Sequence, residues 1–152
     1  MPGTASLDAG RYYAHPRNQF WPFIEAIFGI PATDAYADRC RQLADRQVAL
    51  WDVLRSCQRP GSLDAAIVGA SVVANDFAGF LDGHPCIHSI FFNGAKAEQL
   101  FIRQVIPQLG NRVARLHLQR LPSTSPANAS IPKPDKLAAW RRIRDLREPP
   151  SP

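Results

Sequence analysis

Apolar side chains recur at the spacing of a helix face between residues 20 and 28. They stand at i, i+3, i+4, i+7 and i+8, and they are Phe20, Phe23, Ile24, Ile27 and Phe28. This period predicts one helix with a buried face. Pro22 suits its first turn, and Gly29 followed by Pro31 ends it. A second, more polar helix is expected from Asp34 to about Arg46.

Short apolar runs bounded by polar residues predict three strands, over residues 48–54, 87–92 and 113–118. Helices are expected between and after these strands, over residues 62–81, 95–105 and from 135 onward. The alternation predicts an α/β fold, a three-layer α/β/α sandwich with a short parallel sheet.

Two of these expected helices carry further local signals. The helix over residues 62–81 has breaks near Gly69 and Asn75. The last helix has Asp135 as its cap, and one face of it is apolar, formed by Leu137, Trp140 and Ile143.

Polar segments follow the predicted strands, at the edge where ligands of such sheets bind. These segments are Asp52 with the loop after it, the Asn93-Gly94 pair, and the Ser- and Pro-rich loop that contains Ser123–Asn128. We therefore expect a ligand site to be built from these three places in the chain.

The composition is that of an ordinary globular protein, with 152 residues, 45% hydrophobic and 20% charged. A net charge of +5 and a pI near 9.6 suit a polyanionic partner, although many cytoplasmic proteins are mildly basic. The cations of the last helix form either a solvated face or a track for phosphates. They are Lys136, Arg141, Arg142, Arg144 and Arg147.

The sequence gives little support for a cofactor, a metal site or a membrane-spanning segment. The three cysteines Cys40, Cys57 and Cys86 are far apart and odd in number, so neither a disulfide framework nor a metal or iron–sulfur site is expected. The start of the chain lacks the basic and apolar regions of a secretory signal, and no apolar run is long enough to span a bilayer. We expect a cytoplasmic monomer without cofactor, metal or membrane partner.

Several segments, in this order, carry a family resemblance. Residues 12–21, YYAHPRNQFW, are similar to the A-H-P-x-N-x-F-W segment of mismatch-specific uracil/thymine-DNA glycosylases. The other segments are Pro2-Gly3 with Ser6, Leu50–Leu54, Gly61–Asp64, Phe91–Ala97 and Leu121–Pro126. Together they resemble the uracil-DNA glycosylase superfamily, and most of all its hypoxanthine-DNA (deoxyinosine) glycosylase branch.

The resemblance implies a single glycosylase domain over residues 1–147. The terminal residues 148–152 are expected to be a disordered tail. Two departures stand out. Met1 occupies the position at which uracil-type relatives carry a water-activating Asn or Asp, as an apolar residue does in the deoxyinosine branch. The first strand of the family fold precedes that motif, so we expect this chain to lack it.

Residues of the segment 12–21 are assigned to catalysis and base binding by the resemblance. Asn18 is expected to position the attacking water, because a carboxamide oxygen can orient a water and support positive charge at C1′; the alternative is a helix cap. Tyr13 is expected to stack on the flipped base, or else to be an ordinary half-buried aromatic. His15 faces either a phosphate or the core.

The remaining site residues follow the predicted strands. Asp52 is expected to accept the N1–H of hypoxanthine, unless it caps the following loop. Asn93 and Gly94 are expected to contact the base edge or sugar. Ser123, Ser125 and Asn128 are expected to contact the phosphates and minor groove; a plain turn made by Pro122 and Pro126 is the alternative.

These features predict a monofunctional, metal-independent DNA glycosylase that acts on DNA containing a deaminated base, most of all hypoxanthine. No lysine is among the proposed site residues, so no Schiff-base lyase step is expected. A uracil/thymine mismatch-specific glycosylase is the alternative within the class. A catalytically inactive nucleic-acid-binding domain of the same fold is the alternative outside it.

Overall fold

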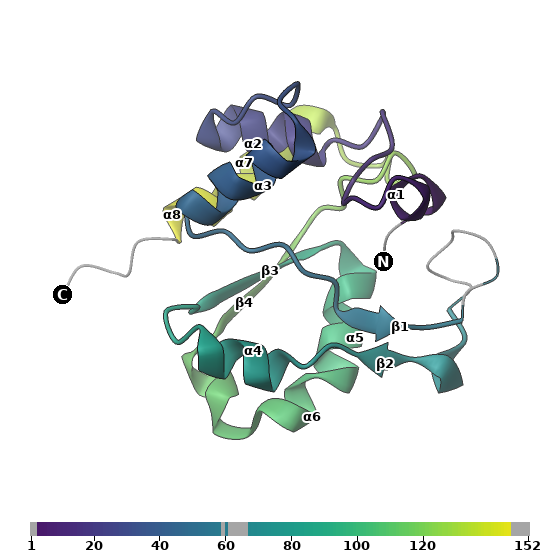
Figure 1. Cartoon of the computed structure of the whole chain (residues 1–152), viewed down its shortest axis with the longest axis vertical. Helices are drawn as coiled ribbons and strands as arrows, with labels where there is room; N and C mark the ends of the chain where they lie inside the picture. The colour runs from purple at the N-terminus through teal and green to yellow at the C-terminus, as the bar shows by residue number, and fades with distance from the viewer. Residues whose placement is uncertain (1–2, 59, 61–66, 147–152) are drawn as a thin grey trace. The chain divides into compact units, whose positions relative to one another are not determined.

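The computed structural model describes residues 3–58, 60 and 67–146. The chain divides into two compact units, one formed by Asp52–Leu121 and the other by Thr4–Trp51 together with the chain from Pro122 onward. Figure 1 shows the helices and strands of each unit. The prediction of one domain over residues 1–147 stays a prediction, and the predicted disordered tail lies outside the described residues.

A pair of parallel strands organises the unit formed by Asp52–Leu121. β3 (Ser89–Asn93) and β4 (His117–Leu121) pair in register along their whole lengths. The chain passes between them through α5 (Ala95–Gln104), α6 (Ile106–Leu109) and the 3-10 helix η3 (Gly110–Arg115). This order confirms the predicted mixed fold with a short parallel sheet, because parallel strands need such a crossover.

The core of this unit forms where α4 (Phe77–Gly83), α5 and β3 meet. The Phe101 ring lies edge-on to Phe77 and tilted to Phe92, with ring centroids 5.1 Å apart in both pairs. Burial of each such aromatic side chain stabilises the fold by about 1.5–3 kcal/mol. The buried residues of this cluster are Phe77, Leu81, Phe92, Phe101, Val105 and Leu109.

The predicted strand over residues 48–54 is wrong except at its last residue. β1 (Leu54–Ser56) pairs antiparallel with β2 (Val73–Ala74), and residues 48–53 are in no strand. Trp51, at the centre of the apolar run, is 41% exposed. A run of apolar residues becomes a strand only where a partner strand accepts and donates its backbone hydrogen bonds. The partner lies elsewhere in the chain, so the run alone does not show whether it will pair.

Two further predictions differ from the structure in this unit. In the helix predicted over residues 62–81, the described part contains the 3-10 turn η2 (Gly69–Ser71) and β2, and α4 begins only at Phe77. The Asp76 side chain caps α4, accepting from the Gly79 N–H at 2.9 Å. The strand predicted over 113–118 begins at His117, because pairing with β3 sets its register.

Helices alone form the regular structure of the second unit within the described residues. They are α1 (Thr4–Asp8), α2 (Phe20–Phe28), α3 (Tyr36–Asp45), α7 (Lys133–Trp140) and α8 (Arg142–Asp145). The first two predicted helices are confirmed as α2 and α3. Gly29 ends α2 with a φ of 68°, as predicted for a C-terminal glycine.

The helix predicted from Asp135 onward corresponds to α7, which packs on α2, but its predicted cap is wrong. The Trp140 ring lies 5.7 Å from Phe20 and 6.0 Å from Phe23, centroid to centroid. α7 begins at Lys133 with Pro132 as N-cap, so Asp135 lies inside the first turn. A carboxylate there still favours the helix through the dipole of its N-terminus.

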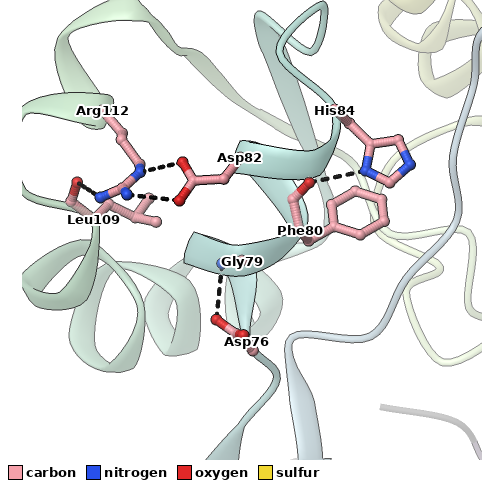
Figure 2. Close-up of polar contacts among 7 residues, drawn as sticks. All are labelled: Asp76, Gly79, Phe80, Asp82, His84, Leu109 and Arg112. Carbon is pink, nitrogen blue, oxygen red and sulfur yellow. Dashed lines mark hydrogen bonds and ion pairs between the residues drawn. The ribbon is translucent and has the colours of Figure 1, made fainter.

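A bidentate ion pair joins α4 to η3 on the surface of the first unit (Figure 2). The Arg112 Nε and Nη2 atoms each donate to one oxygen of Asp82, both at 2.7 Å. These two hydrogen bonds lower the pKa of Asp82 from its ordinary value. The pair therefore stabilises the fold above about pH 4, and the contribution is lost as the pH falls through the lowered pKa.

We expect the change Asp82→Asn to destabilise the protein at pH 7 and to have no effect on stability once the wild-type carboxyl is protonated. Urea unfolding between pH 7 and pH 2 measures the difference. The change Arg112→Gln removes the other partner of the pair and should give the same pH-dependent difference. A constant difference between wild type and Asp82→Asn at every pH would contradict the role of the ion pair.

Candidate active site

The nine predicted site residues fall into two groups, one in each compact unit. Asp52, Asn93 and Gly94 belong to the unit formed by Asp52–Leu121. The structure brings the other six together in the second unit, in two segments that are hydrogen-bonded to each other. These six are Tyr13, His15, Asn18, Ser123, Ser125 and Asn128.

Side chains from three helices hold the backbone on both sides of Tyr13. The Tyr12 N–H donates to the Tyr36 hydroxyl of α3 at 3.1 Å, and its carbonyl accepts from the Trp21 Nε1 of α2 at 3.2 Å. The Ala14 N–H donates to the Ser6 hydroxyl of α1 at 3.2 Å. The segment is irregular, so these bonds replace the ladder that regular structure would supply.

Tyr13 itself adopts a backbone conformation that is rare for a bulky residue. Its φ is 56°, in the left-handed region that costs about 1–3 kcal/mol for a residue other than glycine. Its ring is half-buried and stacks on Phe20, with centroids 3.9 Å apart and planes 19° apart. The base-stacking role of Tyr13 stays a prediction. Strained backbone conformations cluster at active sites and ligand-binding sites, so the φ of Tyr13 agrees with such a role.

His15 and Asn18 form the two ends of a tight turn before α2. The Asn18 N–H donates to the His15 carbonyl at 2.9 Å, and the Arg17 N–H donates to the His15 Nδ1 at 3.1 Å. Nδ1 is therefore the acceptor, which leaves the proton of the neutral ring on Nε2. The half-buried imidazole is not a core histidine, and its phosphate contact stays a prediction.

The Asn18 carboxamide is fixed by the first turn of α2. Its Oδ1 accepts from the Phe20 N–H at 3.0 Å, so the predicted alternative of a capping residue has support. Gln19, which immediately precedes the helix, makes no side-chain capping bond. A carbonyl oxygen has two lone pairs, and Oδ1 can accept a second hydrogen bond from a water. Capping and water positioning are thus compatible, because the cap fixes the direction of the second lone pair.

The loop from Pro122 to Asn128 docks on this segment through its own backbone. The Gln19 N–H donates to the carbonyl of Thr124, whose side chain is fully buried. Within the loop, the Ser123 hydroxyl accepts from the Ser125 N–H at 3.2 Å, and Asn128 Nδ2 donates to the Ser123 carbonyl at 3.2 Å. The Asn128 N–H also donates to the Ser125 carbonyl at 3.0 Å, which closes a turn with Pro126 inside it, so the predicted alternative of a proline turn has support. The predicted DNA contacts of Ser123, Ser125 and Asn128 stay predictions.

Two side chains of α7 hold the ends of this loop. Trp140 Nε1 donates to the Pro122 carbonyl at 2.9 Å, and Lys136 Nζ donates to the Asn128 carbonyl. Lys136 is 2% exposed, so its predicted place on an exposed cationic face is wrong. It lies one helical turn before the buried Trp140, on the same face of α7. Arg141, Arg142 and Arg144 are exposed, and Arg147 lies outside the described residues.

The site residues of the other unit have clear backbone roles. The Asp52 carbonyl accepts from Asn75 Nδ2 at 2.8 Å, and the Asp52 side chain is half-buried. Gly94 has a φ of 97° between β3 and α5, and its N–H donates to the Phe92 and Leu121 carbonyls. Only glycine adopts this conformation without strain. The predicted contacts of Asp52, Asn93 and Gly94 with the base stay predictions.

Several residues that hold the site were not predicted to belong to it. Tyr36 and Trp21 also contact Arg39, whose guanidinium lies 4.2 Å above the Trp21 ring, a favourable cation–π geometry. Burial raises the pKa of the Tyr36 hydroxyl above its ordinary value. Ser6, Trp21 and Thr124 lie in segments that carry the family resemblance. Nothing local marks Tyr36, Lys136 and Trp140 as partners of these segments, because their hydrogen bonds join residues that are 8 to 24 positions apart. The unpredicted residues are Ser6, Trp21, Tyr36, Thr124, Lys136 and Trp140.

The described residues contain neither a cluster of metal-binding side chains nor a helix that could span a membrane. No group of three or more His, Cys, Asp or Glu side chains in this part of the chain could hold a metal ion. None of the helices in the same part is both long and apolar enough to cross a bilayer. The resembling segment Gly61–Asp64 and residues Met1 and Pro2 lie outside the description.

Known proteins resemble this chain in sequence and fold, although no protein-family model matches it. A hypoxanthine DNA glycosylase of Methanosarcina acetivorans is 29% identical over 144 residues, which cover 94% of this chain and 85% of that protein. A hypoxanthine DNA glycosylase of Methanosarcina barkeri is 32% identical over 98 residues, which cover 64% and 61%.

A solved structure agrees with these relatives. It is a solution NMR structure from Methanosarcina acetivorans, provisionally assigned as a uracil DNA glycosylase, and it matches with a TM-score of 0.77 and 30% identity. The match covers 97% of this chain and 86% of that one. The predicted family is thus confirmed: the chain belongs to the uracil-DNA glycosylase superfamily, in the branch of the hypoxanthine DNA glycosylases.

Proposed function

We propose that this protein is a monofunctional DNA glycosylase that flips a deaminated base, above all hypoxanthine, out of DNA and hydrolyses its N-glycosidic bond in base excision repair. The names of the two curated relatives support the base. The observation that carries the proposal is the hydrogen bond from the Gln19 N–H to the Thr124 carbonyl. It joins the segment of the water-positioning candidate Asn18 to the loop expected to contact DNA.

The chemistry requires a water to attack C1′ as the bond to the base breaks. The transition state resembles an oxocarbenium ion, so a fixed dipole beside C1′ lowers its energy. The Asn18 carboxamide cannot take a proton from the water. Its oxygen can orient the water and face the developing charge, and the bond from the Phe20 N–H fixes its direction in advance.

The other site residues would bind the flipped nucleotide and the backbone around it. Tyr13 stacks on the base, a contact of about 1–3 kcal/mol, while Asp52 accepts the N1–H of hypoxanthine. Asn93 and Gly94 contact the base edge or sugar, and His15 a phosphate. The hydroxyl and amide groups of Ser123, Ser125 and Asn128 contact phosphates and the minor groove.

A lyase step through a lysine is not part of the proposal. A Schiff base needs an amine that can reach C1′. Lys136, whose Nζ contacts the loop, is 2% exposed and donates to the Asn128 carbonyl. We further propose that the protein acts as a monomer in the cytoplasm.

A panel of duplexes tests the function. Duplexes that contain inosine, uracil, xanthine or a thymine mismatch are incubated with excess enzyme, and abasic sites are measured in single-turnover reactions. We expect the inosine duplex to be cleaved fastest. Faster cleavage of uracil or mismatched thymine would favour the alternative of a uracil/thymine mismatch-specific glycosylase. DNA binding without cleavage of any duplex would identify an inactive binding domain.

The change Asn18→Ala is expected to lower the single-turnover rate on inosine DNA by about 10²–10³-fold, the scale of losing one preorganised polar group. Binding to a non-cleavable duplex should change little, because the interaction matters mainly once C1′ becomes cationic. Asn111→Ala removes the carboxamide of an exposed residue of η3 and is the matched control. A near wild-type rate for Asn18→Ala on every duplex would refute the assignment.

The change Tyr36→Phe removes only the hydroxyl that accepts from the Tyr12 N–H. We expect it to lower the free energy of unfolding by about 0.5–1.5 kcal/mol, the net value of one hydrogen bond. Because the same bond holds the backbone before Tyr13, binding of an inosine duplex should weaken as well. Urea unfolding and fluorescence anisotropy measure the two effects. Unchanged binding with reduced stability would show that Tyr36 does not position Tyr13.

A further inference from the structure

We infer that Lys136 is a positioning residue for DNA binding: from inside the protein, its ammonium group holds the loop Pro122–Asn128 in the conformation that receives the DNA backbone. This inference rests on the proposed function, in which the loop contacts phosphates. It assigns to Lys136 a role distinct from that of an exposed cation that touches the phosphate itself.

The first support is the position of Lys136 on α7. Lys136 and Trp140 are one turn apart on the same helix face, and both are buried. Trp140 Nε1 donates to the carbonyl of Pro122, where the loop begins, and Lys136 Nζ donates to the carbonyl of Asn128, where it ends. One rigid helix therefore fixes the distance between the two ends of the loop.

The second support is the charge. Removing an ammonium group from water is unfavourable, and a methionine of similar length would fill the same space without that penalty. The loop and the residues after it, PSTSPANAS over 122–130, contain no charged side chain. The buried charge is thus retained at a cost beside a loop that offers it no carboxylate, and the hydrogen bond to the Asn128 carbonyl is the interaction that offsets this cost.

The third support is the peptide group that receives the hydrogen bond. The Asn128 carbonyl shares its peptide unit with the N–H of Ala129, an exposed residue. Donation by a charged group to the carbonyl polarises the peptide and makes its N–H a stronger donor. Backbone N–H groups are among the usual phosphate contacts of DNA-binding proteins. The contact with Lys136 therefore prepares this peptide for a phosphate as well as holding the loop.

The experiment compares Lys136→Met with Lys133→Met, which removes an exposed ammonium from the same helix. The Kd for a non-cleavable inosine duplex is measured by fluorescence anisotropy over a range of salt concentrations. For Lys136→Met we expect Kd to rise about 10- to 100-fold, the scale of one charge-assisted hydrogen bond. For Lys133→Met we expect Kd within about threefold of the wild type, and Lys136→Arg should recover part of the loss.

The salt dependence separates positioning from direct contact. A side chain that neutralises one phosphate contributes about −0.9 to the slope of log affinity against log salt. Lys136→Met should leave this slope unchanged and lower the affinity equally at every salt concentration. A slope reduced by about 0.9 would assign Lys136 to a phosphate and overturn the inference. Reduced thermal stability with unchanged Kd would overturn it too, because the residue would then be merely structural.

Hydrogen exchange provides a test that needs no variant, should Lys136→Met fail to fold. In the wild type, the amides of Ser125, Ala127 and Asn128 should exchange more slowly than those of an unstructured peptide. Exchange at unstructured rates would overturn the inference. A wild-type protein that bound no inosine duplex would overturn the proposed function together with it, whereas Lys136→Met binding as tightly as wild type would overturn this inference alone.

Discussion

Irregular backbone that leaves water must find hydrogen-bond partners outside any helix or sheet, and the candidate active site depends on how this chain meets that requirement. Residues 12–19 and 122–128 carry six of the predicted site residues, and both segments are irregular. Side chains of α1, α2, α3 and α7 supply partners at their ends and flanks. The bond between Gln19 and Thr124 then joins one segment to the other.

Ordering such loops is expensive in conformational entropy, at about 1–2 kcal/mol for each residue fixed. When the folded protein already holds them, this cost is met during folding and does not weaken substrate binding later. The aromatic packing of Phe20, Phe23 and Trp140 provides a rigid base for this arrangement. Hydrophobic burial in the second unit thereby helps to fix the positions of the polar groups in the two site segments.

The sequence predicted local features well and long-range ones poorly. α2 and α5 have the expected bounds because helical periodicity and a terminal glycine are properties of neighbouring residues. The apolar run around Trp51 resembled a strand, yet pairing depends on a partner that the run itself does not reveal. The charge of Lys136 suggested an exposed side chain. Its burial is possible because the Asn128 carbonyl accepts a hydrogen bond from its ammonium group, and the sequence does not reveal this contact. The site segments were recognised by their motifs, but the hydrogen bonds that hold these segments in place were not predicted.

At Tyr13 the left-handed backbone lowers the stability of the fold, while the aromatic ring is the group proposed to bind the base. Glycine adopts a φ of 56° freely, so replacing tyrosine by glycine there would relieve strain while removing the ring. A laboratory selection for thermal stability alone therefore favours glycine at position 13 wherever the relief of strain exceeds the loss of the ring's contact with Phe20. A tyrosine that persisted in lineages from hot environments would indicate that selection maintains the aromatic ring itself, at the expense of a more relaxed chain.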